Sequence, residues 1–293
     1  MQAFIHVSRL HIAAIAAMGV LTFGWLFTGT YPWLLMIVCA FDWYIVNLAN
    51  KIADFKEDQA NFITGTAFVI RHRRKLLYAT ISVLIISIVI VHLLNPAITG
   101  LRILGHLLGI TYNWPLLPGK KRLKELYFWK NSSSALGFLI TVFGYPLATA
   151  YHGNPSFQFP TGISWMTVLF SGVFLLLFEV SYEIIYDLRD INGDTFARLK
   201  TYPVVHGEAA AVYIIDILLF FSVLILCMGY LSHIVPWRIF IMTGAPVLQF
   251  IVYKKALRRG ISSRDCIMIT WVGVSMFTIF HLWVLAGLPG VES

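Results

Sequence analysis

The sequence predicts an all-α membrane protein, with nine transmembrane helices in one bundle around a central cavity and the N-terminus in the cytoplasm. Hydrophobic residues make up 58% of the 293 residues and charged residues only 12%, whereas soluble domains carry about 25% charged residues. Apolar runs recur along the chain at the length of about 20 residues that a helix needs to cross a bilayer. The lysines and arginines also fall almost entirely on one side of these runs.

The apolar runs follow one another from end to end, without a linker or low-complexity segment, so residues 1–293 are expected to form a single domain. The first run continues past any plausible cleavage site, which indicates a retained span and not a signal peptide. The fourth run is short and carries Arg102 and His106. The predicted spans are 11–29, 32–49, 76–94, 98–112, 133–151, 163–185, 209–231, 235–253 and 265–287.

Basic residues set the predicted orientation. With the N-terminus inside, all but Arg102 and Arg238 of the 22 lysines and arginines lie on the cytoplasmic side, as the positive-inside rule requires. Topology and contact with membrane lipids therefore account for the net charge of +8, and no nucleic-acid partner is expected. The basic cytoplasmic residues are Arg9 and those in segments 50–75, 113–132, 186–208 and 254–264.

Cysteines and histidines do not predict a zinc site. The three cysteines lie inside apolar runs, where they are expected to be small buried hydrophobic residues. The nine histidines include no HExxH pattern, so zinc-dependent hydrolysis has little support.

Two acidic segments lie where a predicted span ends on the cytoplasmic side. Carboxylates at a membrane edge are costly unless a positive charge lies among them. On a helix each set shares one face, and two such faces across a cavity could hold Mg²⁺ together with a diphosphate. Glu57 is expected to point to water. The first acidic segment consists of Asn50, Asp54 and Asp58, and the second of Asp187, Asp190 and Asp194.

Further cations are needed beside these acids. The aspartates and a diphosphate together carry more negative charge than two Mg²⁺ ions neutralise, and lysine and arginine can stabilise phosphate charge. The sequence supplies Lys120, Lys121, Arg122 and Lys124 in one cytoplasmic loop, followed by Lys130, with Arg189 and Lys200 flanking the second acidic segment.

Acidic residues inside predicted spans are functional candidates by default. Glu179 and Glu183 continue the stripe of the second acidic segment into the sixth span. One of them is expected to bind or deprotonate an acceptor substrate, and an inter-helix hydrogen bond is the alternative. Asp42 could line the same cavity, while Asp216 is expected to be structural.

These motifs resemble the two signatures of the UbiA superfamily of intramembrane prenyltransferases. The family pattern NxxxDxxxD is matched by the first acidic segment, and DxxDxxxD by the second, with Gly193 before the last aspartate. The stretch Lys200-Thr201-Tyr202-Pro203-Val204, the basic loop from Tyr112 to Asn131 and Arg9 also resemble family features. Nine spans is the family's architecture.

The resemblance implies Mg²⁺-dependent transfer of an isoprenyl group from a prenyl diphosphate to a small aromatic or lipid acceptor. Two Mg²⁺ ions would lie between the acidic segments, and an allylic cation would form in a cavity sheltered from water. The residues implied to bind metal and support catalysis are Asn50, Asp54, Asp58, Asp187, Asp190 and Asp194. Those implied to bind the diphosphate are Arg9, Lys121, Arg122, Asn131, Arg189 and Lys200.

Two other functions remain open from the sequence. A UbiA-type terpene cyclase would ionise the same diphosphate without an external acceptor. A membrane transporter would also carry charged residues near its spans, although coupling residues of transporters usually lie near the midplane. For the enzyme, a prokaryotic cytoplasmic membrane with the active site on the cytoplasmic side is the expected location.

Overall fold

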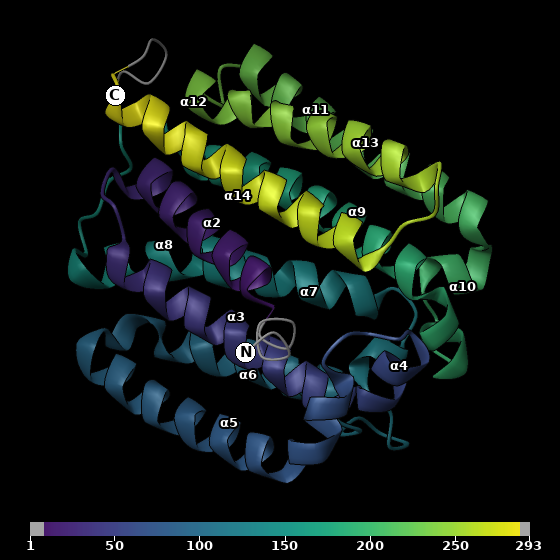
Figure 1. The fold of residues 1–293 in the computed structure, drawn as a ribbon. Helices are drawn as coiled ribbons and strands as arrows, with labels where there is room; N and C mark the ends of the chain where they lie inside the picture. The colour runs from purple at the N-terminus through teal and green to yellow at the C-terminus, as the bar shows by residue number, and fades with distance from the viewer. Residues whose placement is uncertain (1–8, 288–293) are drawn as a thin grey trace.

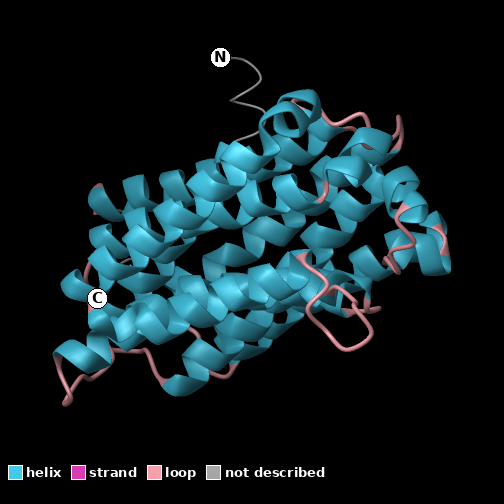
Figure 2. Cartoon of the chain, turned by 90° about the horizontal axis from the view of Figure 1, so that it is seen from below, coloured by secondary structure: helices cyan, strands magenta, loops and turns pink. Residues whose placement is uncertain are grey.

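The computed structural model describes residues 9–287, and within that range the chain is helical without any β-strand. The helices pack side by side into one bundle, and the loops lie mainly toward its two ends (Figures 1 and 2). The predicted all-α class is therefore confirmed.

Seven helical segments are long and apolar enough to cross a membrane. One of them, residues 129–153, is continuous but contains a π-helical turn, η3 (Ile140–Gly144), between α7 (Trp129–Leu139) and α8 (Tyr145–Gly153). The other six are α2 (Leu10–Thr28), α3 (Trp33–Ala53), α5 (Thr66–Leu94), α9 (Trp165–Phe196), α11 (Glu208–Leu231) and α14 (Ser263–Leu285).

The remaining two predicted spans are helical but shorter. Residues 98–112 correspond to the end of η1 (Pro96–Ile98) and to α6 (Thr99–Asn113), which has 15 residues. Residues 235–253 correspond to α12 (Trp237–Phe240), η4 (Ile241–Thr243) and most of α13 (Gly244–Leu257). Seven crossing helices are therefore supported by length and composition, and the count of nine remains a prediction.

The predicted span 76–94 begins too late, and the predicted span 163–185 ends too early. Helix α5 begins at Thr66 and not at residue 76, and α9 continues to Phe196, past the predicted end at residue 185. Hydropathy marks only the apolar part of a helix. The early start of α5 fits its basic run at 71–75, because arginine and lysine are good helix formers. The extension of α9 contains aspartate, asparagine and glycine, which are poor helix formers, so contacts with Lys130 and Asn61 account for it better than propensity does. The second acidic segment consequently lies on α9 itself.

Burial identifies the inner and outer helices. In the apolar 18-residue stretch of each helix, 61% of the residues of α2 are buried, against 11% of those of α5. Helix α2 therefore lies at the centre of the bundle, and α5 lies at its edge, as Figure 1 shows. Ile85, Ile86 and Leu93 of α5 are exposed, which suits a surface that faces lipid.

Besides the short helices already named, three more lie in the segments that connect the long helices: α4 (Phe55–Ala60), η2 (Leu123–Glu125) and α10 (Tyr202–His206). Figure 1 shows α4 and α10 at the same end of the bundle. Both acidic segments are at this end, because α4 carries Asp58 and α10 follows the end of α9.

At least two cavities lie in the part of the chain that the structure describes, where one central cavity was expected. A polar cavity of about 150 Å³ lies among α3, α6, α7 and α9, and an apolar cavity of about 280 Å³ lies among α2, α9, α13 and α14. The α7–η3 segment separates them, because Phe138 lines both, Thr141 lines the polar cavity and Val142 lines the apolar one. A π-helical turn changes the direction of successive side chains, and such turns are frequent at functional sites.

Candidate active site

The first acidic segment spans a break between two helices. Helix α3 ends at Ala53 and α4 begins at Phe55, with Asp54 between them. The helical backbone hydrogen bonds nevertheless continue, since Asp54 N–H donates to Asn50 O at 2.8 Å and Asp58 N–H donates to Asp54 O at 2.9 Å. The predicted i, i+4, i+8 spacing of these three residues is therefore retained across the break.

Lysine and arginine side chains neutralise this segment. Lys124 Nζ lies 2.5 Å from Asp54 Oδ1 and 2.7 Å from Glu57 Oε2, and Lys51 Nζ lies 2.7 Å from Asp58 Oδ2. Arg122 donates to Glu57 Oε1 at 2.8 Å. The expectation that Glu57 points to water is wrong, because two cations hold its carboxylate against the α3–α4 junction.

Burial and these ion pairs act in opposite directions on the pKa values of the neighbouring Asp54 and Glu57 carboxyls. Burial raises the pKa of Asp54 to about 6, despite the nearby ammonium of Lys124. Burial would also raise the pKa of Glu57, but the charges and hydrogen bonds of Lys124 and Arg122 together hold that pKa below its ordinary value. A second positive charge at Asp54 would therefore be favourable.

The second acidic segment lies on consecutive turns of α9. Lys130 of α7 bridges two of its aspartates, at 2.7 Å from Asp187 Oδ1 and 2.8 Å from Asp194 Oδ2. Asn131 Nδ2 donates to Asp187 Oδ2 at 2.8 Å. Asp190 is paired with its neighbour Arg189, whose Nε donates to Asp190 Oδ1 at 2.7 Å.

One contact joins the two acidic segments. The Oδ1 atom of Asn61, just after α4, accepts a hydrogen bond of 2.7 Å from the backbone N–H of Gly193 on α9. A Cβ atom at Gly193 would overlap the Asn61 amide, so only glycine permits this approach. The Gly193 predicted from the family pattern thus has a local physical reason.

The predicted diphosphate-binding residues fall into two groups. Arg9, Arg122, Asn131 and Arg189 lie at the acidic segments or at the polar cavity, where Arg9 Nη1 donates to Asn47 Oδ1 at 3.4 Å. Lys121 and Lys200 are exposed, and among residues 9–287 neither side chain forms an ion pair. The structure therefore brings the first group to the site and does not bring the second.

The donor set fits a hard divalent cation with a diphosphate. The side chains of the six residues in the two acidic segments carry oxygen atoms that could serve as ligands, and Asn50 Oδ1 is buried without a hydrogen-bond donor. Within the described range, however, no three acidic, histidine or cysteine side chains gather closely enough to hold a metal by themselves. Such a set suits Mg²⁺, which usually takes one or two carboxylates and completes its shell with water and phosphate oxygens.

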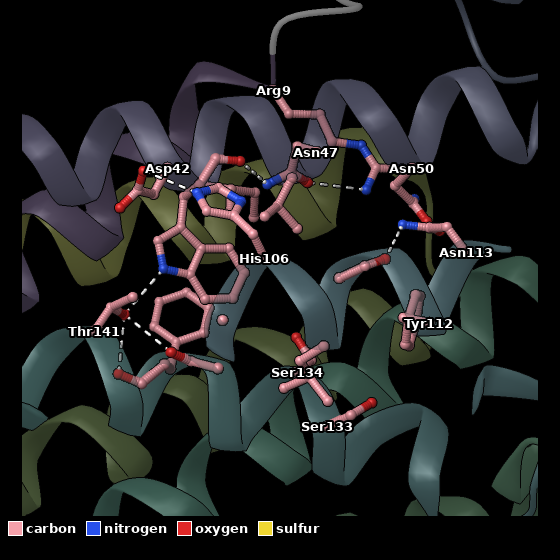
Figure 3. Close-up of a pocket in the computed structure, with 18 of the residues that line it drawn as sticks. Arg9, Asp42, Asn47, Asn50, His106, Tyr112, Asn113, Ser133, Ser134 and Thr141 are labelled. Atoms are coloured by element: carbon pink, nitrogen blue, oxygen red, sulfur yellow. Dashed lines mark hydrogen bonds and ion pairs between the residues drawn. The ribbon is translucent and has the colours of Figure 1, made fainter. Parts of the chain in front are cut away.

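The polar cavity extends from this site to a buried charged cluster (Figure 3). Asp42 accepts hydrogen bonds from Arg102 Nε at 3.0 Å, His106 Nε2 at 3.1 Å and Tyr145 Oη at 2.9 Å. Arg102 also donates to both oxygens of Ser87. Asp42 lines the cavity as expected, but its carboxylate is fully engaged by this cluster.

The two glutamates of α9 face different cavities. Glu183 lines the polar cavity and accepts a hydrogen bond of 2.7 Å from Ser134 Oγ. Glu179, one turn away, lines the apolar cavity, together with the amide of Gln249 and the indole of Trp283. Asp216 is structural, as expected, because Lys254 and Tyr253 hold its carboxylate.

Several site residues were not identified from the sequence. Lys51 lies inside the first motif and its spacing to Asp58 would have indicated a pair across the end of a helix. No pattern in the sequence indicates that Asn61 contacts Gly193, because that contact joins segments 132 positions apart. Lys124 and Lys130 were predicted only as members of a general basic set.

Comparison with known proteins supports a fold shared over the whole chain. The model of the UbiA prenyltransferase family matches residues 10–277. A UbiA homolog from Archaeoglobus fulgidus bound to GPP and Mg²⁺ is 14% identical, with a TM-score of 0.69 over 97% of this chain and 99% of that chain. The same homolog bound to DMAPP and Mg²⁺ is 15% identical, with a TM-score of 0.68 over 96% and 97%.

A structure reported for digeranylgeranylglyceryl phosphate synthase is 17% identical, with a TM-score of 0.56 over 99% of this chain and 98% of that chain. No curated protein matched the chain in the comparison. At these identities the solved structures show the fold alone.

Substituting Gly193 tests the contact between the acidic segments. Gly193→Ala should lower the free energy of unfolding by about 1–3 kcal/mol, because its methyl group would overlap Asn61. Thermal unfolding of the purified protein in detergent measures this. Gly100→Ala on α6 is the control, since a Cβ there meets open space. The double variant Gly193→Ala/Asn61→Ala should regain most of the lost stability, because the overlapping amide is removed. An unchanged midpoint in Gly193→Ala contradicts the contact.

The Asp42–Arg102 pair makes a second prediction about stability. Arg102→Leu leaves the Asp42 carboxylate buried without its cation and should cost about 3–5 kcal/mol. The double variant Asp42→Leu/Arg102→Leu should be more stable than Arg102→Leu alone, because no unpaired charge remains. Thermal unfolding of the three proteins decides this, and a double variant less stable than the single one would refute it.

Proposed function

The chain belongs to the UbiA prenyltransferase family, and from this premise we propose that it is a Mg²⁺-dependent intramembrane enzyme that transfers an isoprenyl group from a prenyl diphosphate to an acceptor, releasing diphosphate. The acceptor we favour is a small aromatic molecule. The observation that carries the proposal is the contact of Asn61 with Gly193, which joins the two acidic segments at the end of the bundle where Asn50 lines the polar cavity.

The two acidic segments would hold Mg²⁺, two ions on our proposal, with the diphosphate between them. Bound Mg²⁺ would supply charge that weakens the allylic C–O bond and stabilises the departing diphosphate. The GPP and DMAPP complexes of the Archaeoglobus fulgidus homolog support this substrate class. The ligands would come from Asn50, Asp54, Asp58, Asp187, Asp190 and Asp194.

The lysines of the site would change partners when the substrate binds. Lys124 and Lys130 neutralise the aspartates in the structure, and both would be released to bind diphosphate oxygens as Mg²⁺ takes their place. Arg9, Arg122 and Arg189 lie near enough to add charge to the same anion. Asn131 would keep Asp187 oriented, while Lys121 and Lys200 would reach the diphosphate only by turning in from the surface.

The two cavities would divide the substrates between them. The apolar cavity suits the isoprenyl chain, because its lining is phenylalanine, isoleucine, valine and methionine with Glu179 and Gln249. The polar cavity suits the acceptor, because asparagine, serine and tyrosine side chains line it. Phe138, which lines both, lies where the two substrates would meet.

Transfer then needs an attack by the acceptor and removal of its proton. When the C–O bond breaks, its electron pair leaves with the diphosphate, and the acceptor's electrons form the new C–C or C–O bond. Glu183 would take the acceptor proton, because its carboxylate lines the polar cavity. Glu179 would contact the substrates from the apolar side, and Asp42 would act indirectly by fixing His106 at the cavity wall.

The membrane placement completes the proposal. We place the chain as a single domain, residues 1–293, with nine spans in a prokaryotic cytoplasmic membrane, the N-terminus and the active site facing the cytoplasm. The basic residues near both acidic segments support that side by the positive-inside rule.

A turnover assay with an acceptor tests the function. Purified protein with Mg²⁺ and GPP should release diphosphate only when a phenolic acceptor is added, with the prenylated product identified by mass spectrometry. Release without an acceptor, together with a hydrocarbon product, would instead indicate a terpene cyclase. Absence of turnover with prenyl diphosphates of every chain length, with solute flux in vesicles, would indicate a transporter.

Metal dependence is tested through the acidic segments. Chelation with EDTA should abolish turnover and Mg²⁺ should restore it, while Asp54→Ala and Asp190→Ala should each lower turnover by about 10²-fold or more through loss of a ligand. Asp216→Asn is the control, because that carboxylate pairs with Lys254 away from the site. Wild-type turnover in both alanine variants would refute the metal assignment.

A further inference from the structure

Helices α3 and α6 face each other in three layers along the polar cavity. Asp42 meets His106 in the first layer, and a Cβ at Gly109 would lie 3.5 Å from Val46 in the second. Asn50 and Asn113 follow one turn further along each helix, and both line the cavity. Figure 3 shows this third layer at the end of the cavity opposite Asp42.

The third layer contains two amide oxygens without a donor. Asn113 is 3% exposed, and its Nδ2 donates to Gly109 O at 2.9 Å. The Oδ1 atoms of Asn113 and Asn50 are buried without a hydrogen-bond partner. In the described part of the chain these are the only amide oxygens in that state. Leaving a buried acceptor unsatisfied costs about 1–3 kcal/mol, so the pair is suited to a ligand that brings a positive charge or a donor.

A hydrated cation fits this position better than an organic donor. Asn50 belongs to the first acidic segment, one turn from Asp54. The C-terminal end of α6 is also close to Asp54. Lys124 Nζ pairs with Asp54 and lies 6.0 Å from the ring centroid of Tyr112, the residue before Asn113. Neutral carbonyl oxygens beside carboxylates are a ligand mixture that hard divalent cations accept.

We propose that Asn113 supplies a further oxygen ligand, from α6 and outside both acidic segments, to the divalent cation held at Asn50 and Asp54. The ligand acts on the cation directly or through one of its waters. The inference rests on the proposed function, since it assumes the metal site, and it adds a residue that neither acidic motif contains. Helix α6 thereby becomes part of the metal site as well as a wall of the polar cavity.

Binding of Mn²⁺ tests the proposal without relying on turnover. The measurement is the Mn²⁺ dissociation constant by electron paramagnetic resonance, for the full chain in detergent with inorganic diphosphate. Asn113→Leu should weaken Mn²⁺ binding about tenfold, the loss typical of one supporting ligand group. Asn113→Asp should tighten it, because a carboxylate replaces a neutral oxygen. Thr111→Val is the matched control on the same helix, since the Thr111 hydroxyl only bonds to its own helix backbone.

Asp54→Ala separates this inference from the proposed function. If Asp54→Ala weakens Mn²⁺ binding while both Asn113 variants bind like the wild type, the role of Asn113 is refuted and the metal site stands. If Asp54→Ala binds Mn²⁺ normally, the metal site fails and the inference fails with it. Size-exclusion chromatography shows whether Asn113→Leu folds. If it does not fold, Asn113→Asp alone decides, and Mn²⁺ binding to Asn113→Asp that is unchanged or weaker than wild type overturns the proposal.

Discussion

Ion pairing of buried carboxylates is the constraint on which this structure depends. Each aspartate of the two acidic segments is paired with a cation: Lys124, Lys51, Lys130 or Arg189. Removing two charges from water costs energy that their attraction only partly returns. Apolar residues in the same places would therefore stabilise the fold about as well as this set of ion pairs does. Their presence at one end of an otherwise apolar bundle is better explained by a charged ligand that exchanges with the lysines.

The same pairs organise the backbone around the site. Lys124 ties the loop after α6 to the α3–α4 junction, and Lys130 ties α7 to α9. The Asn61–Gly193 hydrogen bond then fixes the distance between the two acidic segments. Three contacts between segments far apart in sequence thus gather the carboxylates at the end of the bundle where Asn50 lines the polar cavity.

The sequence predicted the helical class, the acidic stripes and the basic loop, because periodicity and charge are local properties of a chain. The extension of α9 through Asp194 was underestimated, since hydropathy falls where the helix continues. Pairing between distant segments could not be predicted: Glu57 was assigned to water, yet it accepts a hydrogen bond from Arg122 of a distant loop. The presence of two cavities was also missed, because the α7–η3 segment lies between them and no composition rule marks its π-helical turn.

The length of α6 has a consequence for the surrounding lipid. Its 15 residues rise about 22 Å, whereas the hydrocarbon core of a bilayer is about 30 Å thick. On the nine-span topology this mismatch is relieved by a thinner bilayer beside α6, by flanking polar side chains that reach to the headgroups, or by association with another chain. Asn113 is the last residue of α6 and lines the polar cavity. A bilayer that thins at this end of the helix would bring its headgroups closer to a residue of that cavity.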